Sequence, residues 1–520
     1  MAVATTGTLS TNRYVDAVLD GGDKWTGGLT PDGRTIITMN FIGFGAAEPD
    51  WTEFWEDGAF FAAAVGFERV CNIDLVHTMD TATADIRIQT GPSSIASLRL
   101  LDASGPAYGV SDLPSSQLGR PAPVQQVRTA FNTDPFLDPG ANTSPTGWSQ
   151  DGVAKGGFGY WTIIHELGHA LGLMHPFPEG SPAPTNRPLA ATDVAEDSLL
   201  TMMSYSTGGL NPTTGWYDLT RDQTYVRDTA TGATLLGHGY LGGPSVIDIA
   251  ALQVLYGANR TIAGGNDTYR LTDGGTDEFW QTLWDTGGVD QIVYGGTRAC
   301  RISLAPVSLE APITTASVAN TISQAKGING GFLIADDLTD ALPDRGRVQG
   351  VIIENATGGS GNDTLRGNGV DNILSGRNGQ DKLYGGRGND TLLGGKLKDT
   401  LAGSFGQDTL TGGLGNDVFV LARGQGKDQV TDFHNSAGDN DRLHVSLEGL
   451  GGGLTSGTLA ASQFRSRGDN HAQDLNDRFI FRTSDATLWF DANGSSAGGL
   501  SLLADLQGGA RMTSGDVLLI

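Results

Sequence analysis

The chain has 520 residues, of which 77 are glycine, and its 58 acidic and 33 basic residues give a formal net charge of -25. This charge repels phosphate groups, so it argues against nucleic acids and anionic membranes as partners. With 38% hydrophobic residues the chain is too apolar for a disordered polyanion, and its length allows about two to four domains with cores of their own.

The first part of the chain predicts a helix followed by two strands. Residues 1–16 lack the basic segment and apolar run of a secretory signal peptide, so we expect no N-terminal export signal. The longest apolar run, Ala59–Phe67, is too short to span a bilayer. Apolar residues at helical spacing over Asp50–Val70 predict a packed helix, and Asn72–Val76 and Ala84–Gln89 predict strands.

Two further helices follow a long loop region rich in Ser, Pro and Gly, at about residues 103–150. We expect one helix over Trp161–Leu173, because Pro176 prevents its continuation. Another is expected over Val246–Tyr256, with Gly257 as its C-cap. Helices mixed with strands predict an α/β or α+β domain up to this point. The two cysteines, at positions 71 and 300, are too few for a disulfide framework and are interpreted as buried free thiols.

The second predicted helix contains the pattern His-Glu-x-x-His-x-x-Gly-x-x-His. His165 and His169 are four residues apart and project from one helical face, and Glu166 is close enough to hold a water molecule on a metal. Gly172 allows the chain to turn, so that His175 approaches the same point from another direction. Three neutral nitrogens with an open position describe a catalytic zinc site. The alternative, ordinary surface histidines, is poor because such a motif arises by chance roughly once in 10⁵ chains.

The other five histidines show no ligand spacing and are interpreted as ordinary structural or surface residues. They are His77, His238, His434, His444 and His471.

A nine-residue repeat runs seven times from Gly358 to Val420. Its glycine-rich half predicts a tight turn that brings carbonyl and carboxylate oxygens inward, and its second half predicts a short strand. One repeat buries almost nothing, so the stack must form together, and hard oxygen ligands select calcium. A flexible linker would not keep its apolar residues in register. Position eight is apolar throughout, at Leu365, Leu374, Leu383, Leu392, Leu401, Leu410 and Phe419.

The repeat resembles the calcium-binding nonapeptides of RTX proteins, whose strands form a parallel β-roll. If two nonapeptides make one turn, residues eighteen apart stack into two columns. The first column is Asp363, Asp381, Asp399 and Asp417, and the second is Asn372, Asp390 and Asp408. Val370 and Leu397 replace the usual glycine at position four. Asn372 replaces a carboxylate, so that end of its column is expected to bind calcium more weakly.

The segment Thr201–Tyr205, which reads Thr-Met-Met-Ser-Tyr, supports the zinc motif. Three histidines followed by a Met-turn resemble the metzincin proteases. Pro176 directly after the third histidine, and the form Met203-Ser204-Tyr205, are similar to the serralysins, bacterial metzincins fused to an RTX β-roll. The segments Asp248–Gly257, Trp284–Asp290 and Ile353–Gly359 resemble serralysins in the same order.

The resemblance implies one catalytic zinc ion bound by His165, His169 and His175, with Glu166 as general base. It implies that Met203 forms the floor of the site, although Met202 beside it leaves that choice open. Tyr205 would reach the zinc through its hydroxyl and move to the oxyanion during turnover. It also implies several structural calcium ions. Their ligands would be Asp285, Gly287, Gly288, Asp290 and Glu354 at the junction, and Gly358, Gly361, Asp363, Gly376, Gly379, Asp381, Gly385, Gly388, Asp390, Asp399, Gly403, Gly406, Asp408, Gly412, Gly415 and Asp417 in the repeats.

The fold class expected is an α+β metzincin domain with a five-stranded mixed sheet and an active-site helix, followed by an all-β parallel β-roll. The expected divisions are an N-terminal segment with a removable propeptide (1–18), the zinc protease domain (19–258), a junction (259–356), the RTX roll (357–420) and a C-terminal cap (421–520). Asp428–Leu447 and Phe479–Ile520 predict the strands of the cap.

The implied function is a secreted, calcium-dependent zinc endopeptidase that acts on proteins or peptides, with substrate along Gly105–Pro114. The competing hypothesis is an RTX calcium-binding surface or adhesion module with a vestigial protease domain. Expected partners are substrates, the type I secretion machinery and a small protein inhibitor, with a monomeric chain, no nucleic acid and no stable membrane insertion. Gly515–Ile520 is similar to a type I secretion signal, and a last buried strand is the equally open alternative.

Overall fold

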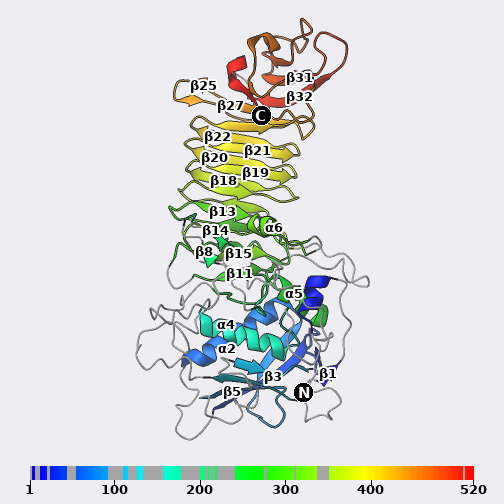
Figure 1. The fold of residues 1–520 in the computed structure, drawn as a ribbon, viewed down its shortest axis with the longest axis vertical. Helices are drawn as coiled ribbons and strands as arrows, with labels where there is room; N and C mark the ends of the chain where they lie inside the picture. The colour runs from blue at the N-terminus through cyan, green and yellow to red at the C-terminus, as the bar shows by residue number, and fades with distance from the viewer. Residues whose placement is uncertain are drawn as a thin grey trace.

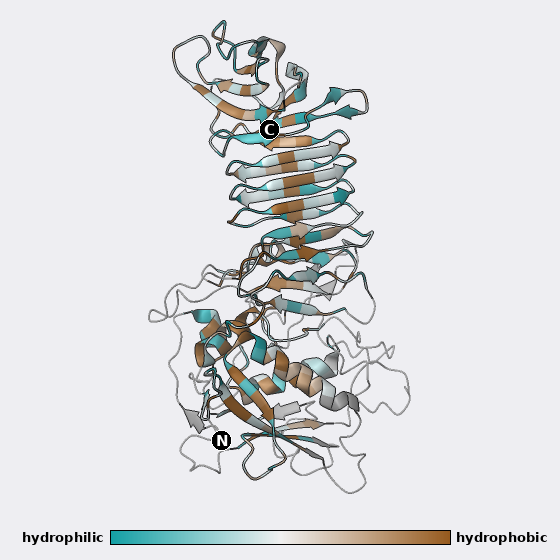
Figure 2. Ribbon diagram, turned by 180° about the vertical axis from the view of Figure 1, so that it is seen from behind, coloured by the Kyte–Doolittle hydropathy of each residue, from teal (hydrophilic) through white to brown (hydrophobic). Residues whose placement is uncertain are grey.

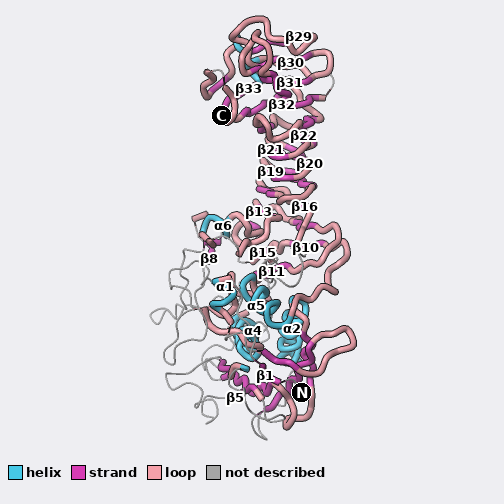
Figure 3. Tube along the Cα trace, turned by 90° about the vertical axis from the view of Figure 1, so that its right-hand side faces the viewer, coloured by secondary structure: helices cyan, strands magenta, loops and turns pink. Residues whose placement is uncertain are grey.

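The structure is a computed structural model of the chain, and it is elongated (Figure 1). Helices and a sheet form the N-terminal part, a narrow stack of strands follows, and a smaller cap lies at the far end (Figures 1 and 3). The described residues are 3–5, 12–19, 24–43, 54–91, 109–114, 126–132, 155, 157–176, 199–204, 209–210, 213–214, 217–218, 240–274, 278–309, 312–328, 330–335, 351–451, 453–507 and 510–520.

A five-stranded mixed sheet in the order β4-β3-β5-β7-β6 lies in the N-terminal part, as predicted. Four strands are parallel, and β6 pairs antiparallel with β7 at one edge. The two strands predicted from the sequence are confirmed as β4 and β5, displaced slightly toward the C-terminus. The strands are β3 (Thr35–Gly43), β4 (Ile73–His77), β5 (Ile86–Gly91), β6 (Gly109–Ser111) and β7 (Val127–Asn132).

Two helices, α2 (Phe54–Val70) and α4 (Phe158–Ala170), pack against this sheet, and a third, α5 (Val246–Tyr256), contacts α2 and α1. All three were predicted, and α5 has the predicted bounds, with Gly257 at φ 82° after it. The active-site helix α4 begins at Phe158 rather than Trp161, because extended Gly157 is its N-cap. It ends at Ala170, before the turn at Gly172 (φ 104°), where a side chain would be strained.

The short helix α1 (Arg13–Ala17) belongs to the protein core. Tyr14, Val15, Ala17 and Val18 are buried in it, and Asn12 caps the helix by accepting from the amides of Tyr14 and Val15. Residues 12–18 are therefore part of the core of the N-terminal part, although the expected division 1–18 places them in a separate segment. Two small strand pairs complete this part: β1 (Val3–Thr5) with β2 (Lys24–Thr26), and β8 (Gly209–Leu210) with β9 (Tyr217–Asp218).

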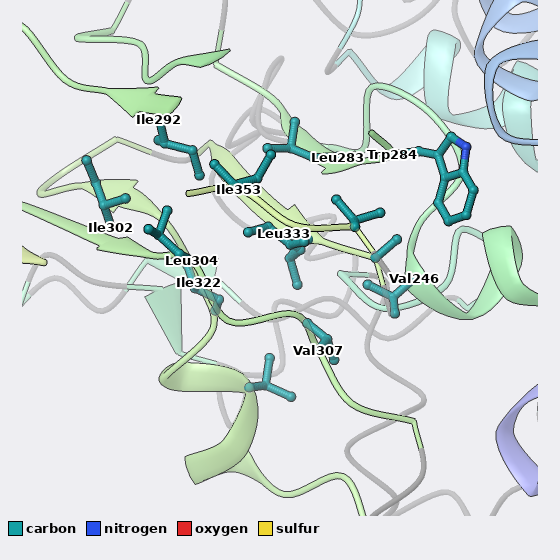
Figure 4. Close-up of a cluster of buried hydrophobic side chains, with 14 of the residues drawn as sticks. Val246, Leu283, Trp284, Ile292, Ile302, Leu304, Val307, Ile322, Leu333 and Ile353 are labelled. Atoms are coloured by element: carbon teal, nitrogen blue, oxygen red, sulfur yellow. The ribbon is translucent and has the colours of Figure 1, made fainter. Parts of the chain in front are cut away.

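The junction shares a hydrophobic core with α5. Figure 4 shows Val246 and Trp284 at one end of a cluster that continues through Leu333 and Ile353 to Ile302. This continuity couples the core of the N-terminal part to the strands that start the roll. The junction elements are β10 (Thr268–Arg270), β11 (Trp280–Leu283), β12 (Gln291–Val293), β13 (Cys300–Ser303), α6 (Thr315–Ala319), β14 (Gln324–Ala325), β15 (Gly331–Ile334) and β16 (Asn355–Thr357).

The repeats form the predicted parallel roll with eighteen residues per turn. Leu365 pairs with Leu383 in one sheet, and Leu374 pairs with Leu392 in the other. All seven residues at position eight are fully buried. Figure 2 shows a band of hydrophobic residues along the middle of the stack. The roll strands are β17 (Thr364–Arg366), β18 (Ile373–Asn378), β19 (Lys382–Arg387), β20 (Thr391–Lys396), β21 (Thr400–Phe405), β22 (Thr409–Leu414) and β23 (Val418–Leu421).

Both roll sheets extend into the predicted cap, through β24 and β32 on one side and β27 and β33 on the other. The last strand, Val517–Leu519, is buried, which agrees with the second interpretation of Gly515–Ile520. The cap comprises β24 (Asp428–Val430), β25 (Asn435–Ser436), β26 (Asp439–Asn440), β27 (Arg442–Val445), β28 (Gly457–Thr458), η5 (Ala461–Gln463), β29 (Phe464–Arg467), β30 (Phe479–Arg482), β31 (Thr487–Asp491), β32 (Leu500–Leu506), η6 (Ser514–Asp516) and β33 (Val517–Leu519).

Candidate active site and cation sites

Three histidine side chains meet at the C-terminal end of α4. His165 and His169 lie one turn apart on the helix, and His175 follows the turn after it. Nε2 of His175 lies 3.0 Å from Nε2 of His165 and 3.2 Å from Nε2 of His169. One nitrogen from each ring falls within a group whose atoms all lie within 4.8 Å of one another. This convergence suits a metal ion with three nitrogen ligands.

Backbone carbonyls orient two of these rings. Nδ1 of His165 donates to the Met202 carbonyl, and Nδ1 of His169 donates to the Leu173 carbonyl, both at 2.8 Å. Because a carbonyl only accepts, each Nδ1 carries the proton and each Nε2 keeps its lone pair for the shared point. Burial lowers the pKa of His165 to about 3 and that of His169 to about 4. Both rings are therefore neutral near pH 7, as metal binding requires.

Glu166 lies next to the first histidine and is buried, at 5% exposure. Its Oε2 has no hydrogen-bond partner within the described part of the chain. Burial raises the pKa of Glu166 to about 8. A buried carboxylate oxygen without a protein partner fits a position where a water molecule is held between the acid and a metal. The residues present therefore fit the predicted zinc ion.

The Met-turn packs directly under α4. A Cβ atom on Gly168 would lie 2.6 Å from Met202 Cε and 2.8 Å from Met203 Sδ, so both methionines contact the helix between the two histidines. Both side chains are fully buried. The structure thus gives Met202 a share in the floor that the sequence assigned to Met203. Tyr205 lies outside the described residues.

Asp248 on α5 anchors the Met-turn and is absent from the site residues predicted from the sequence. Its carboxylate accepts from Thr201 Oγ1 at 2.6 Å, from the Met202 amide at 2.7 Å and from the Ser245 amide at 2.9 Å. Burial raises the pKa of Asp248 to about 6, although all three hydrogen bonds lower it. Ser245 and Asp248 form a capping box, and their three-residue spacing was the available sequence signal.

The segment before His175 is held by the chain that follows α1. The Met174 amide donates to the Val18 carbonyl at 2.9 Å, and Leu173 forms a β-bridge with Leu19. These contacts fix the direction from which the third histidine reaches the site. Sequence spacing alone could not reveal them, because they join segments about 155 residues apart.

Acidic side chains also gather at the junction, where the sequence predicts calcium. Asp285 and Asp290 lie together as expected, joined by Asp267, which was not predicted. Glu354 accepts from the Asp290 amide at 2.7 Å. A Cβ atom on Gly288 (φ 133°) would lie 1.9 Å from the Gly265 carbonyl oxygen, so only glycine fits there. Asp290 is fully buried with Oδ2 unpartnered among the described residues, and burial raises its pKa to about 6.

The aspartates of the roll form the two predicted columns. In each column an Asp oxygen accepts from the amide of the residue eighteen positions earlier, as Asp381 does from Asp363 at 2.8 Å. The other oxygen, Oδ2, is buried and has no hydrogen-bond partner among the described residues at Asp381, Asp390, Asp399, Asp408 and Asp417. Five orphaned carboxylate oxygens at regular spacing fit the predicted calcium ions.

Each column continues one step beyond the repeats. Asp428 accepts from the Asp408 amide at 3.3 Å, and Asp441 accepts from the Asp417 amide at 2.9 Å. Neither residue was predicted, because the spacing along the chain changes from eighteen to 20 and 24 residues. The position-one glycines lie so close to the carboxylates that a Cβ would contact Oδ2; they are Gly358, Gly376, Gly385, Gly394, Gly403 and Gly412.

A family model for the RTX calcium-binding nonapeptide repeat (four copies) matches residues 357–392 and 393–427. The chain is also 35% identical to serralysin from Proteus mirabilis over 232 residues, covering 42% of this chain and 37% of the relative. Serralysin C from Dickeya chrysanthemi is 35% identical over a match that covers 44% of this chain and 40% of the relative. The chain is similar to the serralysins. Metalloprotease AprA from Pseudomonas entomophila is 33% identical, with 42% and 39% covered.

The chain spans between 35% and 51% of the length of the serralysins it matches. Among solved structures, myroilysin covers 46% of this chain and 99% of its own at 17% identity and a TM-score of 0.25. The medaka hatching enzyme HCE-1 (Oryzias latipes) covers 45% and 95% at 15% identity and a TM-score of 0.21. The nonapeptide match agrees with calcium binding by the roll, and the serralysin match agrees with a catalytic zinc ion.

Proposed function

We propose that the chain is a calcium-dependent zinc endopeptidase of the serralysin type. The observation that carries this proposal is the meeting of three histidine Nε2 atoms beside the unpartnered carboxylate oxygen of Glu166. The similarity to serralysins supports the same activity. Calcium would hold the carboxylates of the roll and the junction in place.

The mechanism assigns a role to each described residue. A zinc ion bound by the histidines supplies Lewis acidity, which activates water and polarises the scissile carbonyl. Glu166 accepts the proton of the attacking water and returns it to the leaving nitrogen. The Met202 carbonyl keeps His165 in the required tautomer, and Asp248 holds that carbonyl in place. Tyr205 is proposed to stabilise the oxyanion.

Substrate is proposed to lie extended beside β6, the antiparallel edge strand within the expected segment Gly105–Pro114. We further propose type I secretion to the outside of the cell, a monomeric state and inhibition by a small protein. None of the helices in the described part of the chain has the length and apolar composition needed to cross a bilayer. Any propeptide would end before Asn12, because α1 is built into the core.

The test is casein cleavage by the zinc-loaded and calcium-loaded chain and by Glu166→Gln. We expect a loss of kcat of at least about a hundredfold, because general-base catalysis contributes about 10² to 10⁴ in rate. Glu448→Gln, which changes an exposed glutamate in the cap, is the matched control and should keep full activity. Retained activity in Glu166→Gln would contradict the mechanism.

The binding-module hypothesis is not favoured, since a vestigial protease should have lost part of its site. Instead His165, His169 and His175 converge, and Glu166 is buried beside them. Absence of cleavage by a folded, zinc-loaded chain would favour that hypothesis over the protease.

A further inference from the structure

A second group of metal-ligating side chains lies at the far end of the roll. His434 precedes the hairpin formed by β25 and β26, which projects from the stack where the cap begins (Figure 1). Asp439 lies in that hairpin, and Asp441 directly follows it. One donor atom of each side chain falls within a group whose atoms all lie within 4.8 Å of one another. The group is remote from the histidines of α4.

The positions of these three residues are set by the backbone around them. The His434 amide donates to Asp441 Oδ2 at 2.7 Å, and the Asp441 amide donates back to the His434 carbonyl at 2.8 Å. Asp441 Oδ1 also accepts from the Asp417 amide at 2.9 Å, which ties the group to the first aspartate column. Asp441 is 1% exposed. Each carboxylate oxygen that accepts one amide keeps a further lone pair for a metal.

The group holds more negative charge than its protein partners satisfy. His434 Nδ1 lies 3.1 Å from Asp439 Oδ2, but Asp439 Oδ1 is buried with no hydrogen-bond partner in the described chain. The adjoining Asp417 is also 1% exposed and has an unpartnered Oδ2. His434 carries at most one positive charge, which cannot neutralise the three neighbouring carboxylates. A divalent cation would supply two further positive charges.

We propose that His434, Asp439 and Asp441 bind a divalent transition metal ion, with zinc as the best match. Calcium takes oxygen ligands, as the roll provides, whereas an imidazole nitrogen with two carboxylates suits zinc and its neighbours. The first aspartate column therefore ends in a site of different chemistry from the calcium positions along it. The short distance between His434 and Asp439 resembles the close approach of the three catalytic histidines. This site does not depend on the proposed peptidase activity.

The test measures bound zinc in the full chain at saturating calcium, after equilibrium dialysis against a zinc buffer. We expect about two zinc ions per chain in the wild type and about one in His434→Ala, Asp439→Asn and His169→Ala, since each variant removes a ligand of one site. His471→Ala is the matched control, because His471 lies only 3.8 Å from the single carboxylate of Asp469 and is 81% exposed. That variant should bind as much zinc as the wild type.

A second measurement separates zinc binding from damage to the cap. In the His169→Ala background, added zinc should raise the thermal midpoint of the cap, and the further change His434→Ala should remove this increase. The proposal is wrong if His434→Ala binds as many zinc ions per chain as the wild type. It is also wrong if His434→Ala and the control His471→Ala lose the same amount of bound zinc. Failure of the catalytic site alone would instead leave one zinc in the wild type that His434→Ala removes.

Discussion

Gly168 occupies the helical position between two of the proposed zinc ligands, where nothing larger fits. Alanine is ordinarily the better helix former by about 1 kcal/mol. Here its Cβ would overlap Met202 Cε at 2.6 Å and Met203 Sδ at 2.8 Å. The ends of these two buried methionine side chains would have to shift, beside the Met202 carbonyl that orients His165.

We therefore expect Gly168→Ala to lower the free energy of unfolding by about 1–3 kcal/mol, as overpacked core substitutions do. It should also speed zinc release, because His165 loses its fixed orientation. Chemical denaturation and zinc transfer to a chromophoric chelator measure the two effects. Gly58→Ala in α2 is the control, since nothing lies within 4 Å of its added Cβ. A Gly168→Ala protein as stable as Gly58→Ala would contradict the packing argument.

The histidine motif predicts the metal ligands but not the residues that hold them in place. The spacing of His165, Glu166 and His169 was enough to predict which side chains converge. It could not reveal Asp248, whose three hydrogen bonds hold the Met-turn from α5. Supporting residues of this kind come from distant segments, so only the folded chain brings them together. The sequence also did not reveal the backbone of Leu397. Its φ of 74° lies in the left-handed region that favours the glycine it replaces.

At the scale of the element, the roll is a stack of buried carboxylates. Burial raises the pKa of Asp399 to about 8 and the pKa values of Asp381 and Asp390 to about 7. In the unfolded chain these groups titrate near their ordinary value of 3.8. Between these values the folded roll binds more protons than the unfolded chain, so its stability falls as pH rises.

Through these aspartates the calcium-free roll should be most stable below about pH 4 and lose that stability as the pH rises to about 8, the reverse of an ordinary salt-bridged aspartate. Calcium should remove this loss, because it binds the ionised carboxylates and releases protons. Circular dichroism melts of metal-depleted protein at several pH values test this, and Asp399→Asn should flatten the dependence. A calcium-free midpoint that rises from pH 5 to pH 8 would contradict the prediction.

The regular part of this element was fully predictable, because one apolar residue and one aspartate recur every nine residues. Its ends were not. Asp428 and Asp441 occupy the next places in the columns, yet insertions in the chain before them break the sequence period. The hairpin that brings His434 to Asp439 lies within one of these insertions. His434, which shows no ligand spacing in the sequence, is therefore one of the residues of the proposed zinc site.

For the whole molecule, α1 links the core of the N-terminal part to the segment of the junction between β13 and α6. Asn12 Nδ2 donates to the Leu309 carbonyl, and the Ile313 amide donates to the Tyr14 hydroxyl, both at 2.7 Å. At the other end of the same segment, Val18 accepts from the Met174 amide next to His175. One short segment thus contacts both halves and supports the third histidine.

Two N-terminal deletions distinguish the role of α1 from that of residues 1–11. Removal of residues 1–11 leaves Asn12 and α1 in place and, among the described residues, takes away the pairing of β1 with β2. Cleavage and zinc content should then stay close to those of the full chain. Removal of residues 1–18 also takes away four buried apolar side chains, Tyr14, Val15, Ala17 and Val18. It should cost several kcal/mol, because each large buried side chain contributes about 1.5–3 kcal/mol.

The amount of zinc retained shows whether α1 and Val18 position His175 or only cover the hydrophobic core. Since the Met174 amide loses its acceptor in the longer deletion, the loop that carries His175 should lose its direction and zinc should dissociate faster. Tyr14→Phe is the milder variant: it keeps the ring and removes only the hydroxyl bonded to Ile313, at a cost of about 1 kcal/mol. The size, the zinc content and the thermal midpoint are measured for the two deletion proteins and for Tyr14→Phe. A chain without residues 1–18 that keeps zinc and its midpoint would refute the link.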